Sequence, residues 1–568
     1  MSPDRTELIQ RQSPLLAGGG ALVVYAMFIA SSYDQRLLTI SGIYVIMVLG
    51  YQFIFGHAGA LSLAQGAFFG VGAYVTGILG SQLGAGFLAT FPASIAIAAG
   101  LALIVGIPVL RLASHYFALA TLALSQLLLL LAINWEPVTG GANGLPGVPP
   151  IQIGDLRIDR GVPQLAFVWG LAGVAILIAS RQLRPIRVAM FTVMRESPLA
   201  VPAFGIDAGL LRLRAFLLSA AFGGAAGALF VHTNRVVSPE TLGFGTMVTC
   251  LTMTVVGGRF RISGAIIGAL LLTHLPEWFR GFDEYYLVMV GVLLLAMVIF
   301  VPDGLASFLK DSSWAGQIRT RARPAEPTDV LDAAKPTLNI TNVSKRYGGI
   351  QALDRVGMSI ETGEIVGLIG PNGAGKTTLA NIITGIDRAD SGSSKSAHID
   401  LAAATPTAIA RNGIARTFQT PQLPNELTVR TAIEVAAANN GGHCLTDTVI
   451  TSCQLINILD APCGTLPHGV RRRVEIARAL AGQPHLLILD EPAAGLAPDE
   501  QTVVAEILRA HAAKGLAILV IDHNIDFLQP LATRLACLDS GRLIADGSVA
   551  DVLADDAVLT AYFGILRQ

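Results

Sequence analysis

The feature that most constrains this chain is a glycine-rich stretch, GPNGAGKTT, at residues 370–378. An apolar run at 365–369 precedes it and another at 379–383 follows it, which is the order of a strand, a tight turn and the start of a helix. The spacing G-x-x-x-x-G-K-T lets successive backbone N–H groups surround a polyphosphate at the positive end of the helix. Lys376 adds an ammonium group, and Thr377 is placed to hold a magnesium ion. The residues predicted to bind nucleotide here are Gly370, Pro371, Asn372, Gly373, Ala374, Gly375, Lys376, Thr377 and Thr378.

Composition divides the 568 residues into a membrane part and a soluble part. A mean hydropathy of +0.58 with 14% charged residues is too apolar for a wholly soluble protein, so part of the chain is expected in lipid. Long apolar stretches recur up to about residue 302, and the charge density beyond residue 335 is that of a soluble α/β domain. We therefore expect a transmembrane domain at 1–309, a flexible linker without apolar period at 310–336, and a nucleotide-binding domain at 337–568.

Cysteine usage argues against several other classes of protein. The five cysteines include no CxxC pair, which indicates reduced thiols rather than a disulfide framework or a zinc site. The first apolar run is followed by no small-residue cleavage site, so no cleavable secretory signal is expected. The formal net charge is -1, and nothing suggests nucleic-acid binding.

The membrane part contains apolar segments close to the roughly 20 residues that a helix needs to cross a bilayer. They lie near residues 15–32, 37–55, 59–83, 89–110, 115–133, 165–180, 215–234, 244–275 and 284–301. An excess of arginine between residues 181 and 214 places that segment in the cytoplasm, which puts the 134–164 loop outside. The nucleotide-binding domain must also be cytoplasmic, so the chain must cross the membrane an even number of times after residue 214. The 244–275 run is therefore expected to break into two crossings at Arg259 and Arg261. This gives ten crossings and a cytoplasmic N-terminus.

Polar side chains interrupt the apolar run at 56–74. They are His57, Ser62, Gln65 and Tyr74. Polar groups at membrane depth either line a transport pathway or make hydrogen bonds between helices, and both interpretations stay open for this run. The small residues at 223–228 are expected to allow close packing of helices.

Several stretches of the membrane part resemble the permease subunits of branched-chain amino acid ABC importers. These are 56–74, 116–122 (YFALATL), 134–145 (NWEPVTGGANGL) and 238–240 (SPE). The resemblance covers most of residues 15–305. It implies a helical membrane domain of about ten helices of the ABC importer permease type, with the substrate path between this permease and a second one.

In that family a cytoplasmic segment of the permease inserts into a cleft of the ATPase. The matching segment here is 195–207. Ser197 and Pro198 are expected to supply the N-cap and the first position of its short helix. Pro202 departs from this expectation, because it removes a backbone donor inside the helix.

Two carboxylates follow the apolar strand expected at 486–489, at the edge of a buried parallel sheet. Asp490 is placed to bind the magnesium ion through water, and Glu491 to polarise the attacking water. Both roles are needed, because phosphoryl transfer depends on in-line positioning and charge neutralisation.

Residues 337–568 resemble ABC ATPases throughout, and specifically the ATP-binding subunits that serve hydrophobic amino acid importers. The resemblance implies an α/β P-loop ABC ATPase domain. In it Tyr347, on the loop before the nucleotide strand, stacks on adenine. Gln419, in the stretch ARTFQ, senses magnesium beside the permease contact, and His523 reaches the γ-phosphate.

The family's Leu-Ser-Gly-Gly-Gln-like turn, which completes the ATP site of the opposing subunit, is irregular in this chain. The matching stretch is 466–470 (LPHGV), where Gly469 is kept and the backbone can approach phosphate. The serine and the final glutamine are absent, and Ala497 replaces an expected aspartate. We therefore predict that the two composite ATP sites of the assembly are unequal.

The leading interpretation is a permease fused to its ATPase, forming half of an importer that uses ATP to carry branched-chain amino acids. The resemblance implies ATP and Mg²⁺ as cofactors. It also implies a second permease, a second ATPase and an extracytoplasmic substrate-binding protein as partners, in the lipid of a bacterial inner membrane with the ATPase domain in the cytoplasm. Two alternatives stay open: import of urea or short amides, whose transporters have very similar permeases, and a membrane-tethered ATPase that transports nothing. The 195–207 segment together with Gln419 argues against the last, because coupling is useless without an alternating pathway.

Overall fold

The computed structural model describes residues 31–112, 114–279, 285–309, 337–396, 399–440 and 446–563. The chain divides into two compact units, Met1–Arg187 with Gly209–Trp314 and Val188–Ala208 with Ala315–Gln568. The first is called the helical unit and the second the α/β unit. The expected linker at 310–336, and all but the last two residues of the expected span at 15–32, lie outside the described residues.

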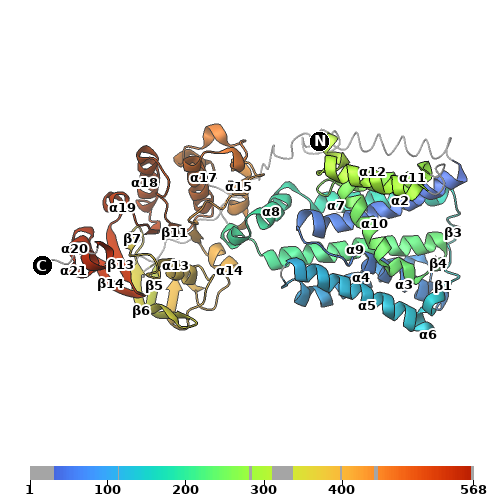
Figure 1. The fold of residues 1–568 in the computed structure, drawn as a ribbon, viewed down its shortest axis with the longest axis horizontal. Helices are drawn as coiled ribbons and strands as arrows, with labels where there is room; N and C mark the ends of the chain where they lie inside the picture. Colours follow the sequence, from blue (N-terminus) through green and yellow to red (C-terminus); the bar gives the residue numbers. More distant parts are fainter. Residues whose placement is uncertain are drawn as a thin grey trace. The chain divides into compact units, whose positions relative to one another are not determined.

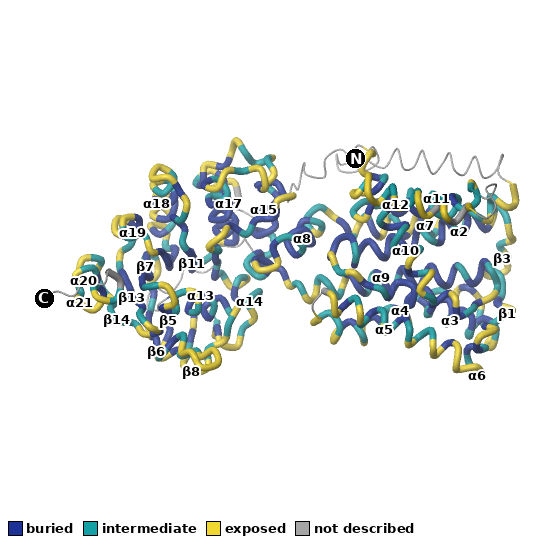
Figure 2. The backbone as a smooth tube through the Cα atoms, viewed as in Figure 1, coloured by how far each residue is buried: buried dark blue, intermediate teal, exposed yellow. Residues whose placement is uncertain are grey.

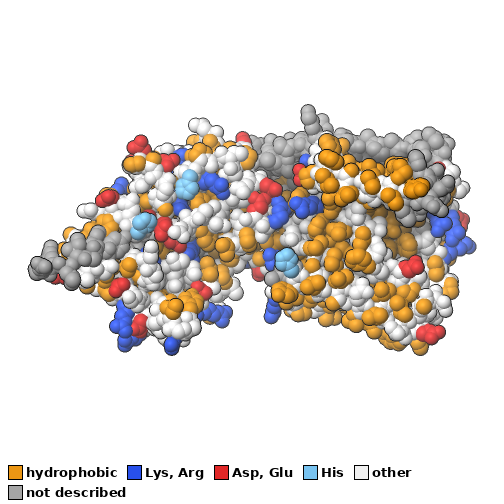
Figure 3. All heavy atoms as spheres, viewed as in Figure 1, with side chains coloured by type: hydrophobic (Ala, Val, Ile, Leu, Met, Phe, Trp, Pro, Cys, Tyr) orange, Lys and Arg blue, Asp and Glu red, His pale blue; other side chains and the backbone are white. Residues whose placement is uncertain are grey.

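The apolar segments of the helical unit form helices (Figure 1). Their bounds are α2 (Ser32–Tyr51, continued by the π-helix η1, Gln52–His57), α3 (Gln65–Ser81), α4 (Phe87–Val109), α5 (Ser114–Asn134), α7 (Val162–Gln182), α9 (Ala208–Asn234), α10 (Phe244–Gly257), α11 (Ile262–Trp278) and α12 (Tyr286–Phe300). Among the described residues, five helices are long and apolar enough to cross a membrane: α2 with η1, α4, α5, α7 and α9. Hydrophobic side chains cover much of the visible face of this unit (Figure 3). The prediction of a membrane domain with several apolar helices is confirmed.

The long apolar run at 244–275 is broken between α10 and α11, as the sequence predicts. The break lies between Gly258, whose φ of 120° favours glycine, and Arg261. Gln52 Nε2, from η1, donates hydrogen bonds to the backbone oxygens of Gly258 (3.0 Å) and Arg261 (2.8 Å). The side chain of Gln52 therefore bonds to two backbone carbonyl groups at the break.

Gln65 in the polar run at 56–74 makes hydrogen bonds between helices. Its Nε2 donates to the backbone oxygens of Met47 (3.1 Å) and Ser219 (3.2 Å). The Ser219 hydroxyl donates in return to Gln65 Oε1 (2.6 Å). For Gln65 the structure supports the interpretation of bonding between helices. His57, Ser62 and Tyr74 are buried as well.

Small residues allow α3 and α9 to approach closely. A β-carbon on Gly227 would collide with the backbone oxygen of Phe69, and one on Gly72 would collide with the backbone of Gly224. Close approach of backbones is how helices associate in lipid, where apolar burial gives little gain. The expectation of close packing at 223–228 is thus confirmed.

The α/β unit contains two sheets (Figure 1). The main sheet has the order β10-β11-β12-β7-β13-β14 and is parallel except for β14. Its strands are β10 (Ile414–Arg416), β11 (Leu486–Asp490), β12 (Ala517–Ile521), β7 (Ile365–Ile369), β13 (Arg534–Asp539) and β14 (Arg542–Gly547). The second sheet, β6-β5-β8-β9, is antiparallel, with β6 (Ile350–Ile360), β5 (Leu338–Tyr347), β8 (Ser391–Ser396) and β9 (Ile399–Asp400).

Helices surround the main sheet. They are α13 (Lys376–Ile383), α14 (Pro406–Arg411), α15 (Val429–Asn439), α16 (Thr446–Ser452), α17 (His468–Leu480), α18 (Pro498–Ala512), α19 (Ile525–Leu531), α20 (Val549–Ala554) and α21 (Asp556–Val558). Of these, α15 and α16 pack against α17. Alternate residues of β7 enter different cores: Ile365 and Ile369 pack in one, Val366 and Leu368 in the other. The strands β7, β11 and β12 are buried throughout (Figure 2). Because these strands are parallel, the residues after each of them meet at one edge of the sheet.

The segment at 195–207 belongs to the α/β unit and forms two 3₁₀ turns instead of one short helix. It follows α8 (Pro185–Glu196), and its turns are η3 (Pro198–Ala200) and η4 (Pro202–Phe204). A proline is the first residue of each turn, as was expected for the first of them. Ser197 holds the N-cap position of the first turn, as predicted, but its side chain makes no capping hydrogen bond. The second proline lacks the N–H that would continue a helix, so the segment starts a new turn there.

Candidate active site

The glycine-rich stretch at 370–378 joins β7 to α13 and packs closely against the sheet. Gly370, Gly373 and Gly375 have φ values of 147°, 84° and 104°, a region that favours glycine. A β-carbon on Gly370 would collide with the backbone oxygen of Leu538, whereas one on Gly373 would meet nothing within 4 Å. The loop thus presses one side against the sheet and leaves another side open. Between the glycines, Asn372 is exposed and Ala374 is buried.

The N-terminus of α13 offers positive charge at this loop. The helix begins at Lys376, and no side chain caps it, so its first N–H groups remain available to an anion. Lys376 Nζ folds back and donates to the backbone oxygens of Gly370 (2.6 Å) and Pro371 (2.9 Å). Burial lowers the pKa of Lys376, while the carboxylates of Glu491 and Asp490 act in the opposite direction. Thr377 and Thr378 lie in the first turn of α13.

Asp490 and Glu491 lie at the carboxyl end of β11, as the sequence predicts. Asp490 is the last residue of the strand and is 6% exposed. Glu491 has a φ of 47°, a region unfavourable for residues other than glycine. Its backbone N–H donates to the oxygen of Ile521, the last residue of β12, at 2.7 Å. The neighbouring strand therefore holds this turn and directs the two carboxylates to the sheet edge.

The structure brings Gln419 and His523 to Glu491. Gln419 Nε2 donates to Glu491 Oε2 at 2.8 Å. His523 follows β12, and its Nδ1 lies 3.9 Å from Glu491 Oε1 and 3.7 Å from Asp522 Oδ1. An amide, a carboxylate and an imidazole from three separate segments thus meet at the end of the sheet. Such a cluster can polarise a water molecule and contact a phosphoryl group.

Tyr347 is the last residue of β5, so its expected place on the loop before the nucleotide strand was wrong. The next strand along the chain is β6, not β7. The phenol oxygen donates to Asp387 Oδ2 at 2.8 Å, and the residue is 44% exposed. Burial and the nearby Asp387 raise the pKa of Tyr347, while a hydrogen bond with Thr378 acts in the opposite direction. An exposed aromatic ring is therefore tethered beside the first turn of α13.

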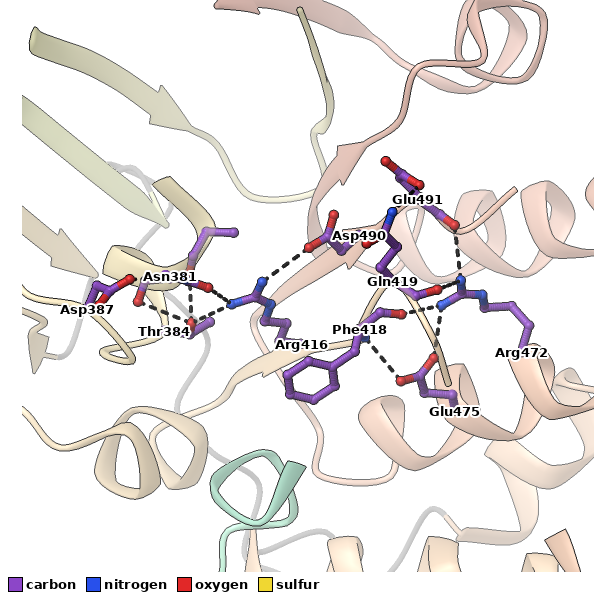
Figure 4. A network of polar contacts seen from close by, with 11 residues as sticks. Asn381, Thr384, Asp387, Arg416, Phe418, Gln419, Arg472, Glu475, Asp490 and Glu491 are labelled. Atoms are coloured by element: carbon purple, nitrogen blue, oxygen red, sulfur yellow. Dashed lines mark hydrogen bonds and ion pairs between the residues drawn. The ribbon is translucent and has the colours of Figure 1, made fainter. Parts of the chain in front are cut away.

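Sequence reasoning did not predict a role for Arg416, the last residue of β10 (Figure 4). This arginine is 5% exposed. Its Nη2 lies 3.2 Å from Asp490 Oδ2. Its Nη1 donates to Asn381 Oδ1 (2.7 Å) and to Thr384 Oγ1 (3.2 Å), both at the C-terminal part of α13. One guanidinium therefore joins β10, β11 and α13.

Three charged residues of α17 were also missed, although their spacing was a usable signal. Arg472, Glu475 and Arg478 recur every third residue, which places them on one side of a helix. All three are buried, and Arg472 Nη1 lies 3.0 Å from Glu475 Oε2. Glu475 Oε1 accepts the backbone N–H of Phe418 (3.1 Å) and lies 4.0 Å from Arg478 Nη2. Arg472 and Glu475 of this triad hydrogen-bond the backbone of Gln419 and Phe418 (Figure 4).

The N-terminus of α17 carries Gly469, the second residue of that helix. A β-carbon on Gly469 would collide with the carboxylate of Glu500 in α18. Glu500 Oε2 also accepts the backbone N–H of Ala497 at 3.1 Å. A larger residue at 469 would therefore force the Glu500 carboxylate to move.

The segment at 195–207 is bonded to residues of α14 and α17 and of the loop before α15. The Glu196 carboxylate accepts the backbone N–H of Asn425 at 2.7 Å. Arg411 Nε donates to the backbone oxygen of Gly205 (2.9 Å), and Arg478 Nη1 donates to that of Ala203 (3.1 Å). Further contacts include Arg195 with Glu426 at 2.7 Å and the Phe204 ring 4.9 Å from Arg478 Cζ.

Comparisons with known proteins find relatives for both parts of the chain. Residues 35–301 match the family described as branched-chain amino acid transport system / permease component, and residues 353–494 match the ABC transporter family. A high-affinity branched-chain amino acid transport system permease protein, LivM of Escherichia coli, is 31% identical over 50% of this chain and 73% of its own length. A probable branched-chain amino acid transport ATP-binding protein, LivG of Methanocaldococcus jannaschii, is 32% identical over 40% of this chain and 97% of its own length.

Among solved structures, a nucleotide-free ATP-binding cassette from an ABC transporter is 31% identical, covers 41% of this chain and 100% of its own, and has a TM-score of 0.38. The α/β unit carries an ABC ATPase domain, which hydrolyses ATP in coupling to transport. The chain belongs to the branched-chain amino acid transport family of ABC transporters, with a permease part and an ATP-binding part in one polypeptide.

Proposed function

We propose that the chain is half of an importer that uses ATP to carry branched-chain amino acids across a bacterial inner membrane. The observation that carries the proposal is the binding of the 195–207 segment to the ATPase domain through Glu196, Arg411 and Arg478. A membrane-tethered ATPase without transport has no use for such a contact. The names of the relatives on both parts of the chain support the amino acid class.

The ATP site is proposed to bind nucleotide through the loop at 370–378 and the ring of Tyr347. The exposed ring offers a stacking surface for adenine. The open side of the loop and the free N–H groups of α13 surround the phosphates, and Lys376 supplies a cation. Lys376 must then exchange its bonds to Gly370 and Pro371 for bonds to phosphate oxygens.

The residues present fit a magnesium ion. Asp490, Thr377 and Gln419 offer carboxylate, hydroxyl and amide oxygens, which are the hard ligands that this ion prefers. The described residues hold no group of three or more His, Cys, Asp or Glu suited to a metal, as expected for an ion that substrate phosphates also hold. When bound, the ion neutralises charge that develops on the phosphates.

Glu491 is the proposed catalytic base, because its carboxylate stands at the sheet edge between Gln419 and His523. It accepts a hydrogen bond from Gln419 and polarises the attacking water. His523, whose side chain is 63% exposed, is proposed to reach the γ-phosphate. Gln419 is also proposed to sense the magnesium ion.

The proposed partners are a second permease, a second ABC ATPase and an extracytoplasmic substrate-binding protein. One ATP site in this family needs two nucleotide-binding domains, and Gly469 of this chain would face the partner's nucleotide. The stretch LPHGV lacks the usual serine and glutamine, so we propose that the two sites of the pair are unequal. The arginine excess at 181–214 supports a cytoplasmic ATPase domain and a multi-pass membrane part with about ten crossings.

The test is ATP hydrolysis by this chain reconstituted with its partner permease, ATPase and binding protein. Leucine, isoleucine or valine should stimulate hydrolysis, and urea should not. Stimulation by urea alone would replace the proposal with the urea importer. A rate that no solute changes would contradict transport coupling itself. Glu491→Gln in the same assembly is the matched control for contaminating ATPase activity.

A further inference from the structure

We propose that Arg416 is a positioning residue that sets the orientation of the Asp490 carboxylate toward the magnesium ion. The inference rests on the role of Asp490 proposed above. It concerns a residue that makes no contact with nucleotide and that is fixed by three different parts of the ATPase domain.

The first argument is the geometry of the Arg416–Asp490 pair. Both side chains are almost fully buried, with 6% and 8% exposure, and Nη2 lies 3.2 Å from Oδ2. No other hydrogen bond to either carboxylate oxygen is found among the described residues, so Arg416 is the donor that orients this carboxylate. It engages one oxygen and leaves Oδ1 to a metal-bound water. Groups that hydrogen-bond a ligating carboxylate in this way tune the affinity of a metal site.

The second argument is that Arg416 is itself fixed to the nucleotide-binding helix. Its Nη1 donates to Asn381 Oδ1 and Thr384 Oγ1 of α13 and its C-cap. Asn381 Nδ2 donates in turn to Asp387 Oδ2 (3.0 Å), the same oxygen that accepts from the Tyr347 hydroxyl. A continuous polar chain thus runs from the Tyr347 hydroxyl through Asp387, Asn381 and Arg416 to Asp490. Figure 4 shows its part from Asp387 to Asp490. The carboxylate is therefore aligned with the helix that presents the phosphates.

The third argument is the support of the Arg416 backbone. Arg478 Nη2 donates to the backbone oxygen of Arg416 at 2.9 Å, and Arg478 Nη1 donates to Ala203 in the 195–207 segment. Arg416 therefore cannot shift independently of the segment that Arg478 also binds. A lysine keeps the positive charge of Arg416. Its single ammonium nitrogen cannot replace the two guanidinium nitrogens that bond to Asp490, Asn381 and Thr384.

The experiment compares Arg416→Lys with the unchanged full-length chain in detergent. Mn²⁺, detected by electron paramagnetic resonance, replaces Mg²⁺, and the non-hydrolysable analogue AMP-PNP replaces ATP. We expect the affinity for Mn²⁺ in the presence of AMP-PNP to fall by roughly 10-fold, in the range found for groups that orient metal ligands. Binding of fluorescent AMP-PNP in EDTA should stay unchanged, because the phosphate loop is intact. Arg416→Lys retains the positive charge, so the effect reports on orientation.

Arg534→Lys is the matched control. Arg534 is another partly buried arginine of the main sheet, bonded to Glu364 and Asp546. It lies at the start of β13, away from the carboxyl ends of the strands. Its replacement should leave the Mn²⁺ affinity unchanged, even where it lowers thermal stability.

Two results would overturn the inference, and they are distinguishable. If the unchanged chain binds Mn²⁺ no better with AMP-PNP than without it, the proposed metal site fails and the role of Arg416 fails with it. If the unchanged chain binds Mn²⁺ at this site and Arg416→Lys binds it equally well, only the positioning role fails. An equal loss of Mn²⁺ affinity in Arg534→Lys would also overturn it, because the loss would then reflect general damage to the sheet.

Discussion

Arg472 donates through Nη2 to the backbone oxygen of Glu491 at 3.0 Å, so a buried residue of α17 fixes the turn that carries the proposed catalytic carboxylate. The same nitrogen donates to the backbone oxygen of Gln419 at 2.7 Å. Two segments that meet at the water site thus share one donor. Their relative position depends on a residue that does not itself reach the site.

Arg472→Lys should therefore lower kcat for ATP hydrolysis with little change in the KM for ATP. A lysine cannot serve both carbonyl groups, and a misplacement of about 1 Å at a catalytic group costs about 100-fold in rate. The measurement is steady-state hydrolysis by the reconstituted assembly. Arg473→Lys is the control on the same helix, because Arg473 bonds instead to the backbone oxygens of Cys453 and Gln454. A rise in KM at constant kcat would contradict the positioning role.

Glu491→Gln should abolish most hydrolysis while ATP binding is kept. The amide has nearly the same shape as the carboxylate but cannot act as a base. Removal of a general base lowers the rate by roughly 10²–10⁴-fold. The measurement is single-turnover hydrolysis together with nucleotide binding.

The same change in the partner ATPase tests the inequality of the two sites. Because the LPHGV stretch of this chain lacks the usual serine and glutamine, turnover should fall by different factors when each chain is changed in turn. Equal losses would contradict an unequal pair.

The strands and the loop of the ATP site could be predicted because their signals are local. The apolar runs before 370 and 490 are strands β7 and β11, and the glycine spacing was a sufficient sign of the loop. Arg416 could not be assigned in this way. Its partners lie 35 and 74 residues away along the chain, and only the folded sheet brings them together.

The detailed structure of the 195–207 segment could not be predicted from the sequence either. A proline was expected at its first helical position, and Pro202 was seen as a departure, but the sequence did not predict two separate 3₁₀ turns. Tyr347 was expected in a loop and ends a strand instead, because pairing with Ile350 on β6 extends β5 to that residue. Pairing of this kind is decided by the neighbouring strand, not by the residue itself.

Glu434 in α15 should make the ATPase domain less stable as the pH rises. Glu434 is 8% exposed, and burial raises its pKa to about 7, with Arg430 lowering it and Asp447 raising it further. Between the ordinary value of 4.5 and about 7, the unfolded chain loses the proton while the folded chain keeps it. The stability that this group contributes is therefore full below pH 4.5 and is lost as the pH rises through about 7.

Glu434→Gln removes this titration, so its stability relative to the unchanged chain should increase from pH 5 to pH 8. The measurement is the urea midpoint of the full-length chain in detergent at both pH values. Glu506→Gln, an exposed position on α18, is the control and should show no such change. A difference between Glu434→Gln and the unchanged chain that is the same at both pH values would contradict the raised pKa.

Arg478→Lys should weaken the stimulation of hydrolysis by substrate-loaded binding protein. Arg478 bonds at once to Ala203 in the 195–207 segment and to the backbone of Arg416, and the Phe204 ring lies over its guanidinium. A lysine keeps the charge but has no planar fork to bridge the two carbonyl groups. Coupling between sites typically amounts to a factor of 5 or more, so we expect the ratio of stimulated to basal rate to fall about fivefold.

The control for this change is again Arg473→Lys, which alters the same helix but has no contact with the segment among the described residues. Both variants should be compared at equal amounts of folded protein, since Arg478 also lies 4.0 Å from the buried Glu475. Loss of stimulation in Arg478→Lys alone would mean that the segment acts on the ATP site through this residue. An equal loss in both variants would contradict a specific role of Arg478, because the loss would then reflect general damage to α17.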